Sequence, residues 1–229
     1  MKGRVSAEMV AAYLREIGID YIPVPRRDHQ PVSATAASPA KRECPPGEET
    51  LEEIRNELAS CRGCALCPGR KTVVFGVGNP GARLMFVGEG PGEEEDRKGE
   101  PFVGAAGRRL NQWIARIGLS RDDVYIANIV KCRPPGNRAP LPAEAAACLP
   151  FLERQIRAIR PVAICTLGGV ALQFLIDSAG KITRDRGKWR EFEGIPVLPT
   201  YHPAYILRNQ TRETEVFSDF DLLAERLRL

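Results

Sequence analysis

Seven cysteines are the residues of this chain with the clearest capacity for chemistry. Cys61 and Cys64 form a C-x2-C pair, and Cys132 and Cys148 follow with 15 residues between them. The count is odd and residues 1–21 lack the apolar centre of a secretory signal, so the pattern favours metal ligation over disulfides. On ligand type alone, four thiolates suit zinc and a [4Fe–4S] cluster equally well.

A glycine-rich segment supplies a second candidate site. The apolar run Leu84–Val87 passes directly into the sequence GEGPGEEED, in which three glycines surround Pro91. Such a loop is tight and lets the backbone approach a ligand closely. It lacks the Lys-Ser/Thr ending of a phosphate-binding loop, and its carboxylates would repel a phosphate. Taken alone, the segment is more typical of a solvated acidic turn.

Length and composition limit the classes of protein to which this chain can belong. The chain has 229 residues, 43% of them hydrophobic, and a formal net charge of +4. This length allows one globular domain with an appendage, and the modest basic excess permits a nucleic-acid partner without arguing for one. No window approaches the ~18 uninterrupted apolar residues of a membrane span. We therefore expect a cytoplasmic protein without membrane contact.

The chain divides into two regions. Residues 7–17 carry apolar residues at helical spacing, and residues 22–49 are rich in Pro, Ala and Ser without a sustained period. Residues 1–49 are therefore predicted to be an extension made of a short helix and a disordered linker. The compact domain is predicted over residues 50–229. Its first helix begins with Thr50 as N-cap and Glu53 completing a capping box.

Within the domain, strand-like and helix-like segments alternate. The expected strands are Leu84–Val87, Val124–Val130, Val162–Thr166 and Ile195–Leu198, and the expected later helices are Gly104–Ile117, Pro142–Ile159, Gly169–Ser178 and Val216–Leu227. This alternation predicts an α/β fold: a three-layer α/β/α sandwich with a mostly parallel central sheet of about four strands. In such folds, ligands bind at the carboxyl ends of the strands.

Three motifs, taken together, resemble the family 4 uracil-DNA glycosylases, which carry an iron–sulfur cluster. They are GEGPGEEED with PFVG behind it, IANIVKCRPPGNR, and LPTYHPAYILRN, and the resemblance covers about residues 51–229. It implies a monofunctional DNA repair glycosylase that hydrolyses the bond between uracil and deoxyribose in base excision repair and leaves an abasic site. The implied partner is uracil-containing DNA, bound by a monomer in the nucleoid of the cytoplasm.

The resemblance also implies roles for three residues in handling the base. Phe102 supplies a flat face on which uracil stacks, Asn128 pairs with O4 and N3–H, and His202 donates a hydrogen bond to O2. Without the resemblance, each has a structural interpretation. Phe102 is then a core aromatic, Asn128 an amide bonded to neighbouring backbone, and His202 a structural histidine.

The roles of the carboxylates in the first motif are harder to assign. Gly90 stands where better-known uracil glycosylases have the aspartate that positions water, a departure shared with family 4. Glu89 and Glu95 are then the candidates for orienting water and stabilising the oxocarbenium-like sugar. An alternative for Glu95 is to border C5 of the base and exclude the thymine methyl group. The neighbours Glu93, Glu94 and Asp96 are expected to face solvent or cap a turn.

DNA contacts are expected from two loops. After His202, an exposed Ile206 is the favoured wedge for the gap left by a flipped nucleotide, and Arg208 is placed on the DNA backbone. Asn137 and Arg138, in the loop after CRPPG, are expected to reach the base or the phosphates. The alternative for the first segment is a helix that packs on the core.

The resemblance favours a [4Fe–4S] cluster on Cys61, Cys64, Cys132 and Cys148. Cys67 is then a bystander or a substitute ligand. Of the two remaining thiols, Cys165 is expected to be buried in a strand and Cys44 to be free in the linker.

Two alternatives stay open at this point. One is a non-catalytic iron–sulfur or zinc module that binds nucleic acid. The other, a relative that links covalently to the abasic product through a histidine, is disfavoured because the loop PPGNRAPLPAE contains no histidine. Nothing in the sequence marks Lys131 as an activated Schiff-base lysine.

Overall fold

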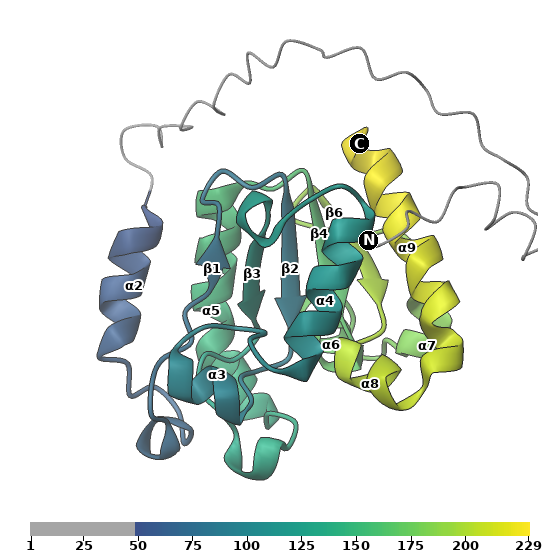
Figure 1. Cartoon of the computed structure of the whole chain (residues 1–229). Helices are drawn as coiled ribbons and strands as arrows, with labels where there is room; N and C mark the ends of the chain where they lie inside the picture. The colour runs from purple at the N-terminus through teal and green to yellow at the C-terminus, as the bar shows by residue number, and fades with distance from the viewer. Residues whose placement is uncertain (1–48) are drawn as a thin grey trace, which may run out of the picture. The chain divides into compact units, whose positions relative to one another are not determined.

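A computed structural model describes residues 49–229 of the chain (Figure 1). The helix predicted over residues 7–17, the linker up to residue 48 and Cys44 lie outside the described residues. The division of the chain at residues 49 and 50 therefore stays a prediction.

One six-stranded sheet forms the centre of the domain, in the order β1-β3-β2-β4-β6-β5. The four inner strands run parallel, and β1 and β5 pair antiparallel at the two edges. The strands are β1 (Val77–Gly78), β2 (Leu84–Gly88), β3 (Tyr125–Asn128), β4 (Ala163–Leu167), β5 (Arg190–Phe192) and β6 (Ile195–Thr200). The α/β fold with a mostly parallel sheet is confirmed, but the count of about four strands is too low. The edge strands escape sequence reasoning because they are short and are not fully buried.

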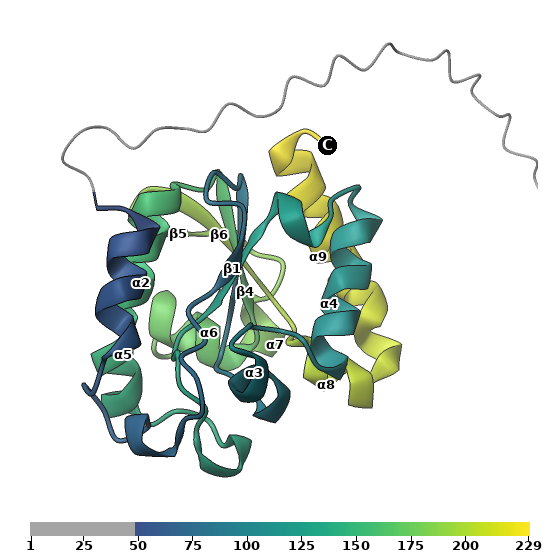
Figure 2. The same ribbon diagram turned by 60° about the vertical axis from the view of Figure 1, so that its left-hand side comes forward.

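Helices cover both faces of this sheet, as the edge-on view shows (Figure 2). Helices α2 and α5 lie on one side, and α4, α8 and α9 lie on the other, which gives three layers. The helices are α2 (Leu51–Ala59), α3 (Glu93–Lys98), α4 (Ala105–Arg116), α5 (Pro142–Ile159), α6 (Gly169–Leu175), α7 (Ile182–Asp185), α8 (Pro203–Arg208) and α9 (Glu213–Leu227). None of the helices in residues 49–229 has the length and apolarity needed to cross a membrane.

Strand β2 shows why the central strands read as unbroken apolar runs. Leu84 and Phe86 belong to the hydrophobic core shared with α4 and α9, whereas Met85 and Val87 belong to the core shared with α5 and α6. Successive side chains point to opposite faces of a strand, and here both faces are covered. Every residue of β2 is therefore buried.

The first helix of the domain, α2, begins at the predicted N-cap residue. The Thr50 hydroxyl accepts a hydrogen bond from the Glu53 amide at 3.2 Å, and the Glu53 carboxylate accepts one from the Thr50 amide at 2.7 Å. The predicted capping box is confirmed. Ile54 and Leu58 of α2 then pack against Phe75, which fixes the end of α2 just before the first cysteine pair.

Helix α4 approaches the backbone of Phe102 so closely that only glycine fits at one position. A Cβ atom on Gly107 would lie 1.7 Å from the carbonyl oxygen of Phe102. The opposing atom is backbone, so no side-chain rotation relieves the overlap. Gly107 thus sets the distance between α4 and the loop that precedes it.

We expect Gly107→Ala to lower the melting temperature by several degrees. Alanine is normally better than glycine inside a helix by about 1 kcal/mol, but overpacking at this contact costs about 1–3 kcal/mol or more. Gly169→Ala, at the start of α6, is the matched control because no atom lies within 4 Å of its Cβ position. A thermal melt compares the two. Equal melting temperatures for Gly107→Ala and the wild type would show that the loop moves away freely.

Candidate active site

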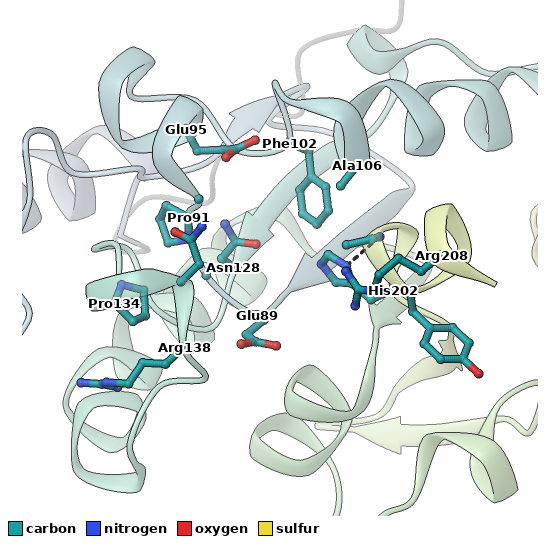
Figure 3. A pocket seen from close by; sticks show the side chains of 15 residues that line it. Glu89, Pro91, Glu95, Phe102, Ala106, Asn128, Pro134, Arg138, His202 and Arg208 are labelled. Atoms are coloured by element: carbon teal, nitrogen blue, oxygen red, sulfur yellow. Dashed lines mark hydrogen bonds between the residues drawn. The ribbon is translucent and has the colours of Figure 1, made fainter. Parts of the chain in front are cut away.

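A pocket of about 460 Å³ lies beyond the carboxyl ends of β2, β3 and β6 (Figure 3). This is the position expected for a ligand in a parallel α/β sheet. Segments far apart in the sequence meet here. Most of the predicted site residues line the pocket: Glu89, Gly90, Glu95, Phe102, Asn128, Asn137, Arg138, His202 and Arg208.

Asn128 is the last residue of β3 and lies beside Gly88 of β2 in the strand register. Its side chain is 1% exposed, and its Oδ1 atom has no hydrogen-bond partner among the described residues. A Cβ atom on Gly88 would lie 2.5 Å from this oxygen and 2.6 Å from the Phe102 ring. Glycine at position 88 therefore leaves room for both side chains, and the Asn128 carboxamide faces the pocket (Figure 3).

Phe102 forms one wall of the pocket and is held in an uncommon backbone conformation. Its φ angle is +53°, in the left-handed region that a bulky residue rarely adopts. Arg121 stabilises this conformation by donating hydrogen bonds to the carbonyl oxygens of Pro101 and of Phe102, the latter at 3.2 Å. The Phe102 ring lies 5.6 Å from the His202 ring, centroid to centroid, so the two rings border the same space.

His202 is the N-cap of α8, and its Nδ1 atom accepts a hydrogen bond from the Ala204 amide at 3.1 Å. The proton of the neutral ring must then be on Nε2. Burial, and next the charge of Arg208, lower the pKa of His202 to about 4. At neutral pH this side chain is an uncharged hydrogen-bond donor at the pocket wall.

The two glutamates of the first motif differ in their surroundings. The Glu95 carboxylate accepts hydrogen bonds from the backbone amides of Val103 and Gly104, at 2.9 and 3.0 Å. Glu89 has no hydrogen bond or ion pair on its carboxylate among residues 49–229, and burial raises its pKa above the usual range. Oε1 of Glu95 thus holds the loop of Phe102, while its Oε2 accepts no hydrogen bond among residues 49–229. Glu89 has neither carboxylate oxygen engaged in that range and points into the pocket (Figure 3).

Gly90 has no room for a side chain unless Val130 moves. A Cβ atom at this position would lie 2.7 Å from Cγ2 of Val130.

Another residue of the first motif differs from expectation. Asp96 was predicted to face solvent or cap a turn, but it is 2% exposed and accepts hydrogen bonds from the amides of Lys71 and Thr72. Its carboxylate fastens α3 to the preceding segment, which sequence spacing does not show.

The prediction that Ile206 is exposed is wrong. Its side chain is fully buried in the core shared with α4 and α9, because one turn of α8 places position 206 on the inner face of the helix. The fold therefore supports the alternative of a helix packed on the core at this segment. Its neighbour Arg208 is exposed and has no ion-pair partner in the described part of the chain.

The two candidates on the loop after β3 are engaged within the protein. Arg138 pairs with the carboxylate of Glu144 through two hydrogen bonds, of 2.8 and 2.7 Å. Asn137 is exposed, and its Oδ1 atom accepts a hydrogen bond from Arg133 at 2.8 Å. Glu144 therefore already offsets most of the charge that Arg138 brings to the pocket rim.

The four predicted cysteine ligands gather where α2 ends, β3 ends and α5 passes. The thiol of Cys132 interacts electrostatically with Cys61 and Cys64, and that of Cys148 interacts with Cys132 and Cys64. Burial is the main cause that raises the pKa of both Cys132 and Cys148, the latter to about 11. Thiols held this close and this deep need a cation to be stable as thiolates.

Hydrogen-bond donors lie close to two of these thiols. Within residues 49–229, no three His, Cys, Asp or Glu side chains are placed to hold one metal ion. Several donors already point at the sulfurs. The Gly63 amide lies 3.4 Å from Sγ of Cys61, and Arg70 Nη1 lies 3.4 Å from Sγ of Cys132.

The two remaining cysteines of the described region differ in burial and in distance from the other thiols. Cys165 is fully buried in β4, as predicted. Cys67 is partly buried at the start of a 3₁₀ turn (Cys67–Gly69), close enough to Arg70 to interact with it. It is therefore near the other thiols, as a bystander or substitute ligand must be.

Sequence reasoning missed the surroundings of Lys131. The side chain is fully buried, and its Nζ atom donates hydrogen bonds to the backbone carbonyl of Asn128 at 2.9 Å and to Oε1 of Gln155 at 2.6 Å. Burial lowers its pKa to about 8. The only signal in the sequence was a lysine inside the apolar run IANIVKC. Lys131 does not line the pocket.

Comparison with known proteins agrees with this arrangement. The model of the uracil DNA glycosylase superfamily matches residues 75–225. The chain is 48% identical over 168 residues to the Type-4 uracil-DNA glycosylase of Thermotoga maritima, covering 72% of this chain and 88% of that protein. It is also 48% identical over 186 residues to the protein of the same name from Archaeoglobus fulgidus, covering 77% and 93%.

A third relative of that name, from Sulfurisphaera tokodaii, is 47% identical over 186 residues, which cover 77% of this chain and 84% of that protein. The resemblance inferred from the three motifs is thereby confirmed, and it extends through the whole sheet. This chain belongs to the uracil DNA glycosylase superfamily and, within it, to the Type-4 uracil-DNA glycosylases.

Proposed function

We propose that this protein removes uracil from DNA by hydrolysing its N-glycosidic bond, which leaves an abasic site for base excision repair. The observation that carries the proposal is the buried Asn128 carboxamide, whose Oδ1 atom has no hydrogen-bond partner within residues 49–229 and faces a pocket walled by Phe102 and His202. The printed names of the relatives support it. The proposed site of action is DNA in the cytoplasm, and the proposed active form is a monomer.

Asn128 is suited to read uracil and reject cytosine. A carboxamide presents an acceptor and a donor side by side, so Oδ1 matches N3–H of uracil and Nδ2 matches O4. Cytosine presents the reversed pair at these atoms. Each mismatched pair leaves a buried polar group unpaired, at about 1–3 kcal/mol. Phe102 supplies the face on which the flipped base stacks, worth about 1–3 kcal/mol.

Bond breaking leaves negative charge on the base and positive charge on the sugar. His202 donates its Nε2 proton as a hydrogen bond to O2 of the departing uracil, and one such fixed donor is typically worth about 3–4 kcal/mol. Glu89 accepts a proton from water and stabilises the oxocarbenium-like sugar, because neither oxygen of its carboxylate is engaged among residues 49–229. Glu95 acts as a positioning residue for the Phe102 loop.

The same geometry argues for a monofunctional enzyme. A Schiff-base mechanism needs an amine within reach of the sugar. The buried amine nearest in sequence, Lys131, is engaged by Asn128 and Gln155 and lies outside the pocket lining. Water is then the nucleophile. Arg208, which is exposed at the rim and has no ion-pair partner among the residues that the structure describes, is the proposed phosphate contact, while Asn137 and Arg138 are secondary candidates.

We further propose that Cys61, Cys64, Cys132 and Cys148 hold a [4Fe–4S] cluster. When bound, the cluster supplies electron-transfer capability and a cross-link. Cys61 and Cys64 follow α2, Cys132 follows β3, and Cys148 lies on α5, so the cross-link would tie the segment after α2 to the segment after β3 and to α5. No step of base removal is assigned to the cluster.

One assay tests the function directly. Pure protein is incubated with a labelled oligonucleotide that contains a single uracil, the product is treated with alkali, and strand breakage is measured at that position. We expect breakage at uracil and none at thymine in the same sequence. Protein that carries its cluster yet breaks neither substrate would favour the alternative of a nucleic-acid-binding module without catalysis.

We expect Asn128→Asp to reduce uracil excision steeply and to lower the preference for uracil over cytosine. The aspartate keeps the size of the side chain but puts a second acceptor opposite O4, whereas the N4 amino group of cytosine donates. Asn128→Ala is the matched comparison, because it removes both the donor and the acceptor of the carboxamide without turning the donor into an acceptor. It should weaken excision without changing the preference. Wild-type activity and selectivity in Asn128→Asp would mean that the base is read elsewhere.

Glu89 should set the acid limb of the pH profile. Its carboxylate must be ionised to accept a proton, so kcat/KM falls as the pH drops through its raised pKa, above the usual 4.5. His202, with a pKa of about 4, stays neutral over that limb. Glu89→Gln should lose about a hundredfold in kcat/KM and show no acid limb down to about pH 5. An unchanged limb in Glu89→Gln would assign it to another group.

Serine at any of the four proposed ligands should lower both iron content and the yield of folded protein. The measurements are iron per chain and visible absorbance of anaerobically purified protein. Cys165→Ser is the control, because that thiol is buried away from the cysteine group. Cluster loss in Cys67→Ser with retention in one of the four would show that Cys67 is a ligand. Zinc without iron in the wild type would overturn the cofactor assignment.

A further inference from the structure

His202 lies two residues after β6, so the end of this strand decides where its ring is placed. Thr200 is the last residue of β6 and is fully buried. Its carbonyl oxygen accepts a hydrogen bond from the Gly168 amide at 2.8 Å, and a Cβ atom on Gly168 would lie 3.0 Å from Cβ of His202. The segment after β4 thus holds the backbone that leads to His202 and leaves little spare room beside it.

The side chain of Thr200 is held by helix α9. Its Oγ1 atom donates a hydrogen bond to Oδ2 of Asp219 at 2.6 Å. Asp219 is 1% exposed, and a buried carboxylate is costly unless a cation and hydrogen bonds offset its charge. Arg186 supplies both, because its Nε atom donates to Oδ2 at 3.0 Å and its Nη2 atom donates to Oδ1 at 2.5 Å. This two-bond pairing fixes the orientation of the carboxylate.

Arg186 also contacts the residue between Thr200 and His202. Its guanidinium carbon lies 5.6 Å from the centroid of the ring of Tyr201, which is buried. The ion pair therefore contacts both residues that precede His202. Asp219 does so through the Thr200 hydroxyl, and Arg186 does so through the Tyr201 ring.

A glycine leaves the room that this ion pair needs. A Cβ atom on Gly187 would lie 2.6 Å from Oδ1 of Asp219, and the φ angle of Gly187 is +70°. The Gly187 amide donates a hydrogen bond to the carbonyl oxygen of Pro199 at 2.9 Å. The segment after α7 therefore reaches the backbone of β6 and the carboxylate of α9 at the same place.

We propose that Asp219 and Arg186 are positioning residues, which set the place of the His202 ring through Thr200 and Tyr201. The inference rests on the proposed function and deepens it. Within residues 49–229, the pocket lining includes neither member of the ion pair, so neither touches the base. Negative charge develops on O2 as the glycosidic bond breaks, and a donor stabilises it best when already aimed at that position. Loss of these contacts should therefore slow bond breaking and leave DNA binding unchanged.

The first test is a single-turnover assay, with full-length holoprotein in excess over an oligonucleotide that contains one uracil. At saturating protein, misfolded molecules do not lower the rate constant, so the assay separates positioning from a loss of folded protein. Thr200→Val removes the hydroxyl and leaves the pair of Asp219 and Arg186 in place. It should lower the saturating rate constant about tenfold, with the half-saturating concentration of folded protein unchanged.

Two matched variants control for this substitution. Thr200→Ser keeps the hydroxyl and should retain the wild-type rate constant. Thr166→Val makes the same change in β4, at a buried threonine whose hydroxyl has no hydrogen-bond partner among the described residues, and should also retain it. Asp219→Asn removes the charge that holds Arg186 and should slow bond breaking by more than Thr200→Val does.

The second test does not depend on activity. Crystal structures of the wild type and of Thr200→Val compare the position of the His202 ring relative to the Phe102 ring, from which it lies 5.6 Å, centroid to centroid. We expect the His202 ring to move in Thr200→Val by more than the ~0.5 Å within which a catalytic group must be held. It should stay in place in Thr200→Ser.

The outcomes separate this inference from the function beneath it. A wild type that carries its cluster but excises no uracil overturns the proposed function, and the inference with it. A wild type that excises uracil, with either a wild-type rate constant or an unmoved His202 ring in Thr200→Val, overturns the inference alone. So does a Thr200→Ser or Thr166→Val protein that is slowed as much as Thr200→Val.

Discussion

A buried amide oxygen that has no hydrogen-bond partner in the described part of the chain is the constraint on which the candidate site depends. The Oδ1 atom of Asn128 ends a parallel strand inside the protein, where an unmatched acceptor costs about 1–3 kcal/mol. A base with a donor at the matching position recovers that cost, and a base with an acceptor there increases it. In the proposed function, selectivity between two similar pyrimidines therefore arises from the unpaired acceptor of Asn128.

The surrounding residues keep that acceptor open and aimed. Gly88 leaves space beside it, and Phe102 is held over the same space by Arg121 and, through the following amides, by Glu95. Gly107 lets α4 approach the Phe102 backbone. These contacts form a rigid frame, in keeping with the need for catalytic groups to be in position before the transition state forms.

Much of the fold could be predicted because it depends on local patterns. The inner strands are continuous apolar runs, and the Thr50 capping box defines the start of α2. Features that depend on long-range packing could not be predicted from the sequence. Asp96 looked like part of a solvated acidic run, but a segment more than 20 residues upstream supplies the amides that bury it. Ile206 looked exposed until α8 placed it against α4 and α9.

The candidate site likewise contains features that the sequence predicts and features that depend on long-range packing. Motif positions brought Asn128, Phe102 and His202 to one pocket, as the resemblance implied. The separation of Glu89 from Glu95 needed the backbone amides that Glu95 accepts, and these belong to a loop whose path the sequence does not reveal. The burial of Lys131 likewise results from α5, which supplies Gln155 from 24 residues further along the chain.

The most direct measurement of the central claim is a crystal structure of the holoprotein with free uracil. The account predicts the ring stacked on Phe102, N3–H within hydrogen-bond distance of Oδ1 of Asn128, and O2 facing Nε2 of His202. Uracil bound in this pocket with Asn128 Oδ1 still unpaired, or bound outside the pocket altogether, would contradict it.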